Sequence, residues 1–149
     1  LFQEVREKRG LVYSIYSFTS SFEDGGIFGV YAGTGKDEVG ELLPIICFEL
    51  QKLAENIHDN EVTRARSQLK ASTLMALEST ASRSEQIARQ LQIFDRIVPV
   101  EEVIKQIDKV NAADLKRITT RLLGSELTFA ALGPIHNVEE FNTIKRRLN

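Results

Sequence analysis

The chain opens with the segment Leu1-Phe2-Gln3-Glu4-Val5-Arg6-Glu7-Lys8-Arg9-Gly10-Leu11-Val12-Tyr13-Ser14, in which the residue pattern changes at Gly10. Before this glycine, residues 2–9 place Phe2 and Val5 on one side and most charged residues on the other, which predicts a helix. A glycine at this point is typical of the left-handed residue that ends a helix. From residue 11 to 19, β-branched and aromatic residues at period two predict a strand.

A β-hairpin should follow from the next residues. The sequence Glu23-Asp24-Gly25-Gly26 is a turn signal, because aspartate–glycine supplies the positive φ angles of a tight hairpin. Residues 27–32 alternate again and should pair antiparallel with the first strand. The sequence Gly33-Thr34-Gly35 then breaks the second strand.

The remainder of the chain is mainly helical by its apolar spacing. The expected helices cover residues 39–53, 60–95 with a possible break near Ser79-Thr80, 100–110, 111–123 and 138–148. Pro44 should kink the first of these, Asp59 or Asn60 should cap the second, and Asn111 should cap the fourth. Residues 127–132 predict a third strand, ended by Gly133-Pro134.

This order of elements predicts an α+β fold, an antiparallel sheet with helices packed on one face. A sheet of three strands is small for this much helix. We therefore expect residues 1–149 to form an incomplete domain, with further strands upstream.

Composition excludes several classes of protein. The chain has 149 residues, a net charge of -2 and 42% hydrophobic residues, which are values of an ordinary soluble domain without a nucleic-acid partner. No apolar run approaches the roughly 18 residues of a membrane span. The single cysteine forms no internal disulfide. We expect a bacterial cytoplasmic protein, unless a targeting signal lies upstream.

Metal-site chemistry is missing from the sequence. His58 and His136 are the two histidines; they are far apart and lie in predicted loops, and no His-x-x-Glu-His motif is present. Cys47 lies on the apolar stripe of a helix, which favours a buried, inert thiol over a nucleophile. We expect no metal ligand in this chain.

Arg6 and Tyr13 are the residues with functional potential. A helix that ends at Gly10 and continues as a strand can direct both side chains toward the same space. A cation and a phenol that converge would be donors to a peptide carbonyl, an oxyanion or a carboxylate. On spacing alone, a surface ion-pair arginine and a half-buried strand tyrosine are the favoured interpretation.

A family resemblance changes this balance. The opening segment resembles the Arg/Tyr segment of the M16 zinc metallopeptidases, and residues 17–35, with Tyr31-Ala32-Gly33-Thr34-Gly35, resemble the hairpin that follows it. Residues 64–70 and 77–83 are similar to the long helices of the family, and Leu132-Gly133-Pro134 to the end of its last strand. The similarity covers essentially the whole chain and is strongest to the bacterial processing-peptidase-like branch.

The resemblance implies two similar α+β domains around a chamber, with the zinc motif in the first domain. This chain would be the back part of the second, zinc-less domain. Arg6 and Tyr13 match the positions that bind the substrate backbone and stabilise the tetrahedral intermediate, and Arg9 is a second substrate-binding cation. Zinc would be held by the N-terminal domain of the parent or by a partner subunit. The implied partners are that domain or subunit and a peptide substrate. A homodimer of this chain is an alternative assembly.

Three functional hypotheses remain. The first is the C-terminal part of a zinc metalloendopeptidase that cleaves peptides or protein precursors, with the isolated chain inactive. The second is a non-catalytic structural or scaffold M16 subunit. The third is an unrelated α+β binding module, which would be supported if Arg6 and Tyr13 pointed to opposite sides of the sheet.

Overall fold

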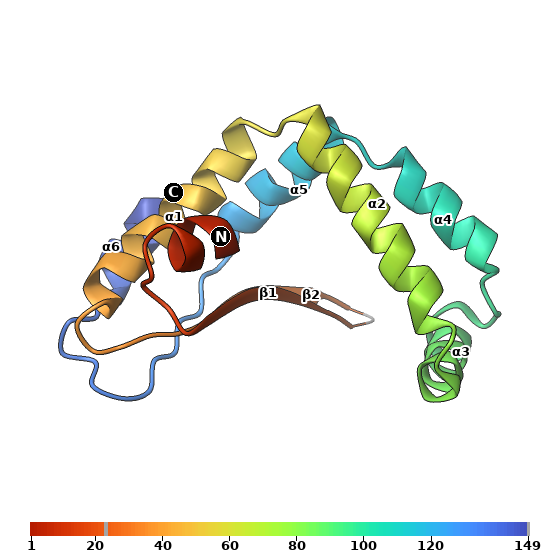
Figure 1. Cartoon of the computed structure of the whole chain (residues 1–149), viewed down its shortest axis with the longest axis horizontal. Coiled ribbons are helices and arrows are strands. Elements are labelled where there is room, and N and C mark those ends of the chain that lie inside the picture. Colours follow the sequence, from red (N-terminus) through yellow and green to blue (C-terminus); the bar gives the residue numbers. More distant parts are fainter. Residues whose placement is uncertain (23, 149) are drawn as a thin grey trace. The chain divides into compact units, whose positions relative to one another are not determined.

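The computed structural model describes residues 1–22 and 24–148, which form seven helices and one two-stranded sheet (Figure 1). The elements are η1 (Phe2–Glu7), β1 (Ser14–Ser21), β2 (Gly26–Gly33), α1 (Val39–Glu55), α2 (Asp59–Ala76), α3 (Thr80–Phe94), α4 (Val100–Lys109), α5 (Ala112–Leu123) and α6 (Phe141–Leu148). They belong to two compact units. The first contains Leu1–Asn56 and Lys116–Asn149, and the second contains Ile57–Leu115. None of the described helices is both long and apolar enough to span a membrane.

The hairpin of the first unit confirms the predicted antiparallel pairing. Its register runs from Ser14 opposite Gly33 to Ser21 opposite Gly26. The N–H of Phe22 donates to the carbonyl oxygen of Gly25 at 2.8 Å and closes the turn. Glu23, which belongs to the predicted turn signal, lies outside the described residues.

One face of this hairpin packs against η1 and α1. Ile15 from β1 joins a buried cluster, whose other buried members are Val5, Leu11, Val12 and Leu42. The half-buried residues Val30 and Ala32 of β2 pack on the same cluster. Both helices lie on the same side of the hairpin (Figure 1). The predicted α+β arrangement, with helices on one face of an antiparallel sheet, is therefore confirmed.

The first strand begins later than predicted. Leu11 and Val12 are buried but precede β1, because they leave the turn to fill the core beneath η1 instead of pairing with β2. The hydroxyl of Thr34 donates to the carbonyl oxygen of Leu11 at 2.5 Å, which satisfies a backbone group that no strand reaches. The alternating pattern therefore indicated correctly that Leu11 and Val12 are buried, but the prediction that they belong to the strand was wrong.

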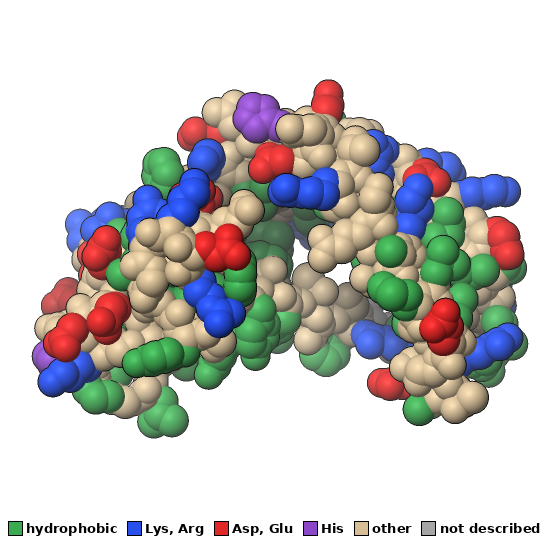
Figure 2. All heavy atoms as spheres, in the orientation of Figure 1, with side chains coloured by type: hydrophobic (Ala, Val, Ile, Leu, Met, Phe, Trp, Pro, Cys, Tyr) green, Lys and Arg blue, Asp and Glu red, His purple; other side chains and the backbone are tan. Residues whose placement is uncertain are grey.

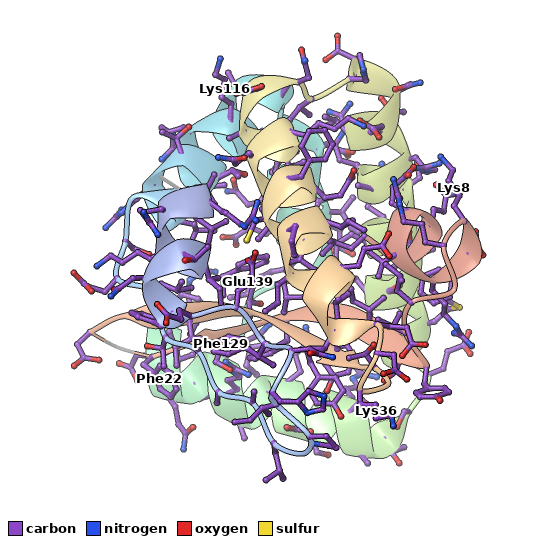
Figure 3. All side chains as sticks on the ribbon, turned by 90° about the vertical axis from the view of Figure 1, so that its left-hand side faces the viewer. Lys8, Phe22, Lys36, Lys116, Phe129 and Glu139 are labelled. Atoms are coloured by element: carbon purple, nitrogen blue, oxygen red, sulfur yellow. The ribbon has the colours of Figure 1, made fainter. Side chains whose placement is uncertain are left out.

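Helix α1, the part of α5 from Lys116 onward and helix α6 also belong to the first unit. Helix α1 continues through Pro44, and α6 packs along it. The expected start of the last helix at residue 138 was wrong, since the helix begins at Phe141. Glu139 lies before that helix and receives two hydrogen bonds from Arg147, at 2.7 and 2.9 Å (Figure 3).

The predicted strand over residues 127–132 is absent. Leu127 and Phe129 are half-buried and alternate with the exposed Thr128 and Ala130, so the periodicity is real. Within the described part of the chain, this segment makes no backbone hydrogen bond to any neighbour. A β-strand is defined by backbone hydrogen bonds to a partner strand. Because this segment has no such partner among the described residues, it is a coil, which carries Phe129 in Figure 3.

Two of three predictions for the helix ends of the second unit are confirmed. Ser79 Oγ accepts the N–H of Ser82 at 3.3 Å, which confirms the break between α2 and α3. Asn111 Oδ1 accepts the N–H of Ala113 at 2.9 Å, which confirms the predicted cap of α5. The expected cap of α2 at residue 59 or 60 was wrong, because the helix already begins at residue 59 and His58 holds the cap position.

Candidate functional site

The candidate site is built on the turn between η1 and β1. Helix η1 has π-helical hydrogen bonding, since the N–H of Lys8 donates to the carbonyl oxygen of Gln3 at 3.0 Å. Gly10 has a φ of 65°, in the left-handed region that was predicted for it. The N–H of Gly10 donates to the carbonyl oxygen of Arg6 at 3.0 Å. The turn therefore has a fixed backbone between the two predicted site residues.

Arg6 lies in the last turn of η1 with an exposed side chain. Its guanidinium carbon lies 5.1 Å from the centre of the Phe2 ring, which is within the range of a cation–π interaction. Among the described residues, Arg6 makes no ion pair with a carboxylate. Its charge therefore remains available to a ligand, contrary to the surface ion pair that spacing alone favoured.

Phe2 was missed as a neighbour of the site. Phe2 and Arg6 are four residues apart, and such pairs face each other on a helix. This spacing was a usable signal in the sequence, which places Phe2 on one side of the helix together with Val5 and the arm of Arg6 or Arg9, but it was not used to predict the contact. The structure instead leaves Phe2 45% exposed, with its ring beneath the guanidinium of Arg6.

Tyr13 immediately precedes β1, and its backbone is fixed while its side chain is free. Its N–H donates to the carbonyl oxygen of Gly33 at 2.8 Å. The side chain is 79% exposed, and within the described residues its hydroxyl forms no hydrogen bond. Tyr13 is thus not the half-buried strand residue that spacing alone favoured. It presents its phenol hydroxyl to solvent.

Arg9 is engaged within its own segment. Its guanidinium donates to the carbonyl oxygen of Glu4 at 2.7 Å and to the Glu4 carboxylate at 3.2 Å. Lys8 donates to the same carboxylate at 2.5 Å. The hydrogen bond from Lys8, followed by that from Arg9, lowers the pKa of Glu4. Arg9 would have to leave this carboxylate to bind a substrate.

The described structure contains no hydrogen bond or ring contact that joins the side chains of Arg6, Arg9 and Tyr13 to one another. It brings Arg6 and Tyr13 to the two ends of one short turn, both exposed. A ligand that contacted both would bridge them. Their catalytic and substrate-binding roles remain predictions.

The residues predicted to lack metal chemistry are dispersed. His58 and His136 are exposed and lie outside helices and strands, as predicted. Cys47 is buried in α1, and this burial raises the pKa of its thiol, as expected for an inert cysteine. In residues 1–22 and 24–148, no three His, Cys, Asp or Glu side chains are grouped so that they could hold a metal ion.

Charges on the surface are mixed in sign. In the view of Figure 2, lysine and arginine side chains are interspersed with aspartate and glutamate. On this face, neighbouring charges of opposite sign therefore partly cancel each other's field.

Comparison with known proteins shows which proteins the segment containing this turn is similar to. Residues 1–69, which include the turn and the hairpin, match the family described as the Peptidase M16 inactive domain. The chain is 37% identical over 135 residues to a probable mitochondrial-processing peptidase subunit beta of Arabidopsis thaliana, which covers 90% of this chain and 25% of that protein. It is 39% identical over 136 residues to an uncharacterized zinc protease of Streptomyces coelicolor, covering 91% of this chain and 30% of that protein.

A solved structure has the same fold. A chain of complex III2 from Candida albicans superposes with a TM-score of 0.88 and covers 97% of this chain and 35% of its own length. The two sequences are 22% identical, so this similarity concerns the fold alone. The chain thus spans 25% to 32% of the length of the first curated relatives that it matches. The sequence relatives and the matching family together show that the chain belongs to the M16 peptidase family, as part of its C-terminal domain.

Proposed function

We propose that this chain supplies substrate contacts and oxyanion stabilisation to a zinc metalloendopeptidase that cleaves peptides or protein precursors. The observation that carries the proposal is the pair of exposed donors, Arg6 and Tyr13, at the two ends of a turn held by Gly10; among the described residues neither side chain pairs with a carboxylate. This turn lies in the part of the chain that matches the M16 family. Two exposed donors that make few contacts within their own fold are suited to contacts with a ligand.

Zinc would have to come from elsewhere in the assembly. The described residues do not fit a zinc site, since three or four ligands must converge on the ion and none of them do. We therefore place the metal in an N-terminal M16 domain or a partner subunit, and assign no step of catalysis to a metal in this chain. Relatives that are named as subunits of a processing peptidase support such a partner.

Two donors would act on the substrate in this proposal. Attack on a peptide carbonyl places negative charge on its oxygen, and a phenol donor directed at that oxygen stabilises the tetrahedral intermediate. Tyr13 would supply this hydrogen bond. Arg6 would hold a neighbouring carbonyl or carboxylate, to which its planar guanidinium can donate two parallel hydrogen bonds. Arg9 would be a weaker substrate contact, because Glu4 competes for it.

The test is Tyr13→Phe in a protein that combines this chain with its zinc-binding half. Loss of one oxyanion donor should lower kcat by roughly tenfold to a thousandfold. The free energy of unfolding should not change, since the hydroxyl has no partner within the described residues. Arg6→Gln should weaken peptide binding, and the matched control is Arg64→Gln, an exposed arginine of α2.

An unchanged kcat for Tyr13→Phe would contradict the catalytic role. That outcome would instead support the hypothesis of a structural subunit, for which neither side chain needs to face a substrate. The fold similarity to a chain of complex III2 does not by itself favour that hypothesis, because it shows the fold alone.

A further inference from the structure

The side chain of Arg6 has an aromatic ring as its neighbour where a carboxylate would be usual. Its guanidinium carbon lies over the Phe2 ring, 5.1 Å from the ring centre. Among the described residues, the guanidinium forms no ion pair and donates no hydrogen bond. The Phe2 ring is therefore the group in this part of the chain that can orient the guanidinium.

A ring can restrain this cation without occupying its donors. A guanidinium has five N–H donors and no acceptor, and a carboxylate that pairs with it takes two of these hydrogen bonds. The face of an aromatic ring instead attracts the charge through its quadrupole and supplies no acceptor oxygen. The donors of Arg6 thus remain free for a substrate oxygen, whereas those of Arg9 are bonded to Glu4.

The neighbouring carboxylates are placed so that they do not compete with Phe2 for Arg6. Glu4 and Glu7 lie two residues and one residue from Arg6, and side chains at these spacings do not face each other on a helix. Phe2, four residues away, does face it. The carboxylate of Glu4 also receives hydrogen bonds from Lys8 at 2.5 Å and from Arg9 at 3.2 Å. These two bonds hold Glu4 away from Arg6.

The backbone that carries the ring and the cation is anchored to the core. Val5 lies between them in the sequence, has 0% of its surface exposed and belongs to the buried cluster of the first unit. Its N–H donates to the carbonyl oxygen of Leu1 at 2.8 Å, and the N–H of Gly10 donates to that of Arg6 at 3.0 Å. The fold therefore determines where the Phe2 ring lies, and the ring in turn restricts the guanidinium.

We propose that Phe2 is a positioning residue, whose ring holds the Arg6 guanidinium in the orientation that receives a carbonyl or carboxylate of the substrate. This inference rests on the proposed function and adds a residue to it. A long, exposed arginine side chain otherwise samples many conformations, and fixing it in one of them costs entropy. The apparent affinity for a ligand falls with the fraction of molecules in the binding-competent state, and the ring raises that fraction.

The test measures KM and kcat for a peptide substrate, in a protein that combines this chain with its zinc-binding half. Phe2→Leu keeps an apolar side chain but removes the ring. We expect KM to rise roughly two- to fivefold, which is the effect on an equilibrium that an exposed cation–π contact typically has. The value of kcat should stay unchanged, because a loss of binding that is equal in the ground state and the transition state raises KM alone.

Further variants separate positioning of Arg6 from a general effect on the fold. Phe2→Tyr keeps a ring and should keep KM, whereas Phe2→Met, a second variant without a ring, should behave as Phe2→Leu does. In an Arg6→Gln background, Phe2→Leu should cause no further rise in KM, because glutamine carries no charge for the ring to attract. This lack of additivity is the coupling that a double-mutant cycle measures. The matched control is Phe48→Leu, which removes a 60% exposed ring from α1 and should change neither constant. Circular dichroism checks that each variant is folded.

Several results would overturn the inference. An equal rise in KM for Phe2→Leu in both backgrounds would mean that the ring acts independently of Arg6. An equal rise for Phe2→Tyr and Phe2→Leu would mean that the ring itself is not the property that matters. A lower KM for Phe2→Leu would mean that the ring holds the guanidinium away from the substrate.

Failure of this inference is distinguishable from failure of the proposed function. If Arg6→Gln raises KM but Phe2→Leu does not, Arg6 binds substrate without help from the ring, and the positioning role of Phe2 is refuted. If Arg6→Gln itself leaves KM unchanged, the substrate contact of Arg6 is refuted together with the role of Phe2. An unchanged kcat for Tyr13→Phe would refute the oxyanion contact of Tyr13 and would not affect the coupling between Phe2 and Arg6.

Discussion

Gly10 joins the two candidate site residues, and replacing it with alanine should destabilise the chain through its backbone alone. Its φ of 65° is a conformation that L-residues with a side chain adopt at a cost of about 1–2 kcal/mol. A β-carbon built on Gly10 has no atom within 4 Å, so no steric clash adds to this cost. We therefore expect Gly10→Ala to lower the free energy of unfolding by about 1–2 kcal/mol.

Urea unfolding followed by tyrosine fluorescence would measure this change. All three tyrosines lie between residues 13 and 31, so the signal reports the hairpin and its turn. Gly10→Asn should be less destabilising than Gly10→Ala, because asparagine tolerates the left-handed conformation better. Gly25→Ala is the matched control. Gly25 also has open space around a built β-carbon but lacks a left-handed φ, so this variant should be neutral or slightly stabilising.

The reasoning would be refuted if Gly10→Ala unfolded at the same urea concentration as the unchanged chain. It would also be refuted if the Gly10→Ala and Gly25→Ala variants lost the same free energy, because the left-handed φ is the property in which the two positions differ. Refutation would mean that the turn does not require its observed conformation. The placement of Arg6 relative to Tyr13 would then lose its structural basis.

Two further predictions concern titratable groups near the core and the turn. Cys47 is 3% exposed and burial raises its pKa, so at pH 8 iodoacetamide should modify it at least about tenfold more slowly in the folded chain than in urea; equal rates would contradict its burial. The pKa of Glu4 is lowered from 4.5 mainly by Lys8 and secondarily by Arg9. A carboxyl group whose pKa is lower in the folded than in the unfolded chain stabilises the fold at pH values above its unfolded-state pKa. This stabilisation is lost as the pH falls through the folded-state pKa. The stability difference between the unchanged chain and Glu4→Gln should therefore shrink as the pH is lowered from about 6 to about 3 in urea titrations, and a constant difference would exclude this ion pair as the cause.

Features set by neighbouring residues were predictable from the sequence. Gly10 ends the first helix because the left-handed region favours glycine, and Asn111 caps α5 because its side chain can reach the N–H groups two and three residues later. The antiparallel hairpin followed from alternation on both sides of a glycine-rich turn. In each case the interacting groups are close in sequence, so the sequence pattern contains the interaction.

Features that depend on distant partners were not predictable in the same way. Residues 127–132 have the alternation of a strand, but a strand is defined by backbone bonds to another segment, which no local pattern can supply. Leu11 and Val12 also alternate with their neighbours, and yet they leave the sheet to fill the core beneath η1. The exposure of Tyr13 was likewise not predictable from the local pattern. Tyr13 extends into solvent because the strand starts one residue after it, which the alternating residues did not indicate.

The contrast between backbone and side chains at the turn supports the proposal that this turn binds a substrate. Tyr13 has its N–H bonded to β2, and Arg6 has its carbonyl oxygen bonded to Gly10, so the folded chain determines where both backbones lie. Their side chains, however, contribute little to that fold, because the tyrosine is 79% exposed and the arginine pairs with no carboxylate among the described residues. A residue kept only for stability would bury its ring or pair its charge, since an exposed side chain gains little from the hydrophobic effect or from ion pairing. An ordered backbone that carries exposed donors is suited to binding an extended peptide, because the backbone needs no reordering when a ligand binds.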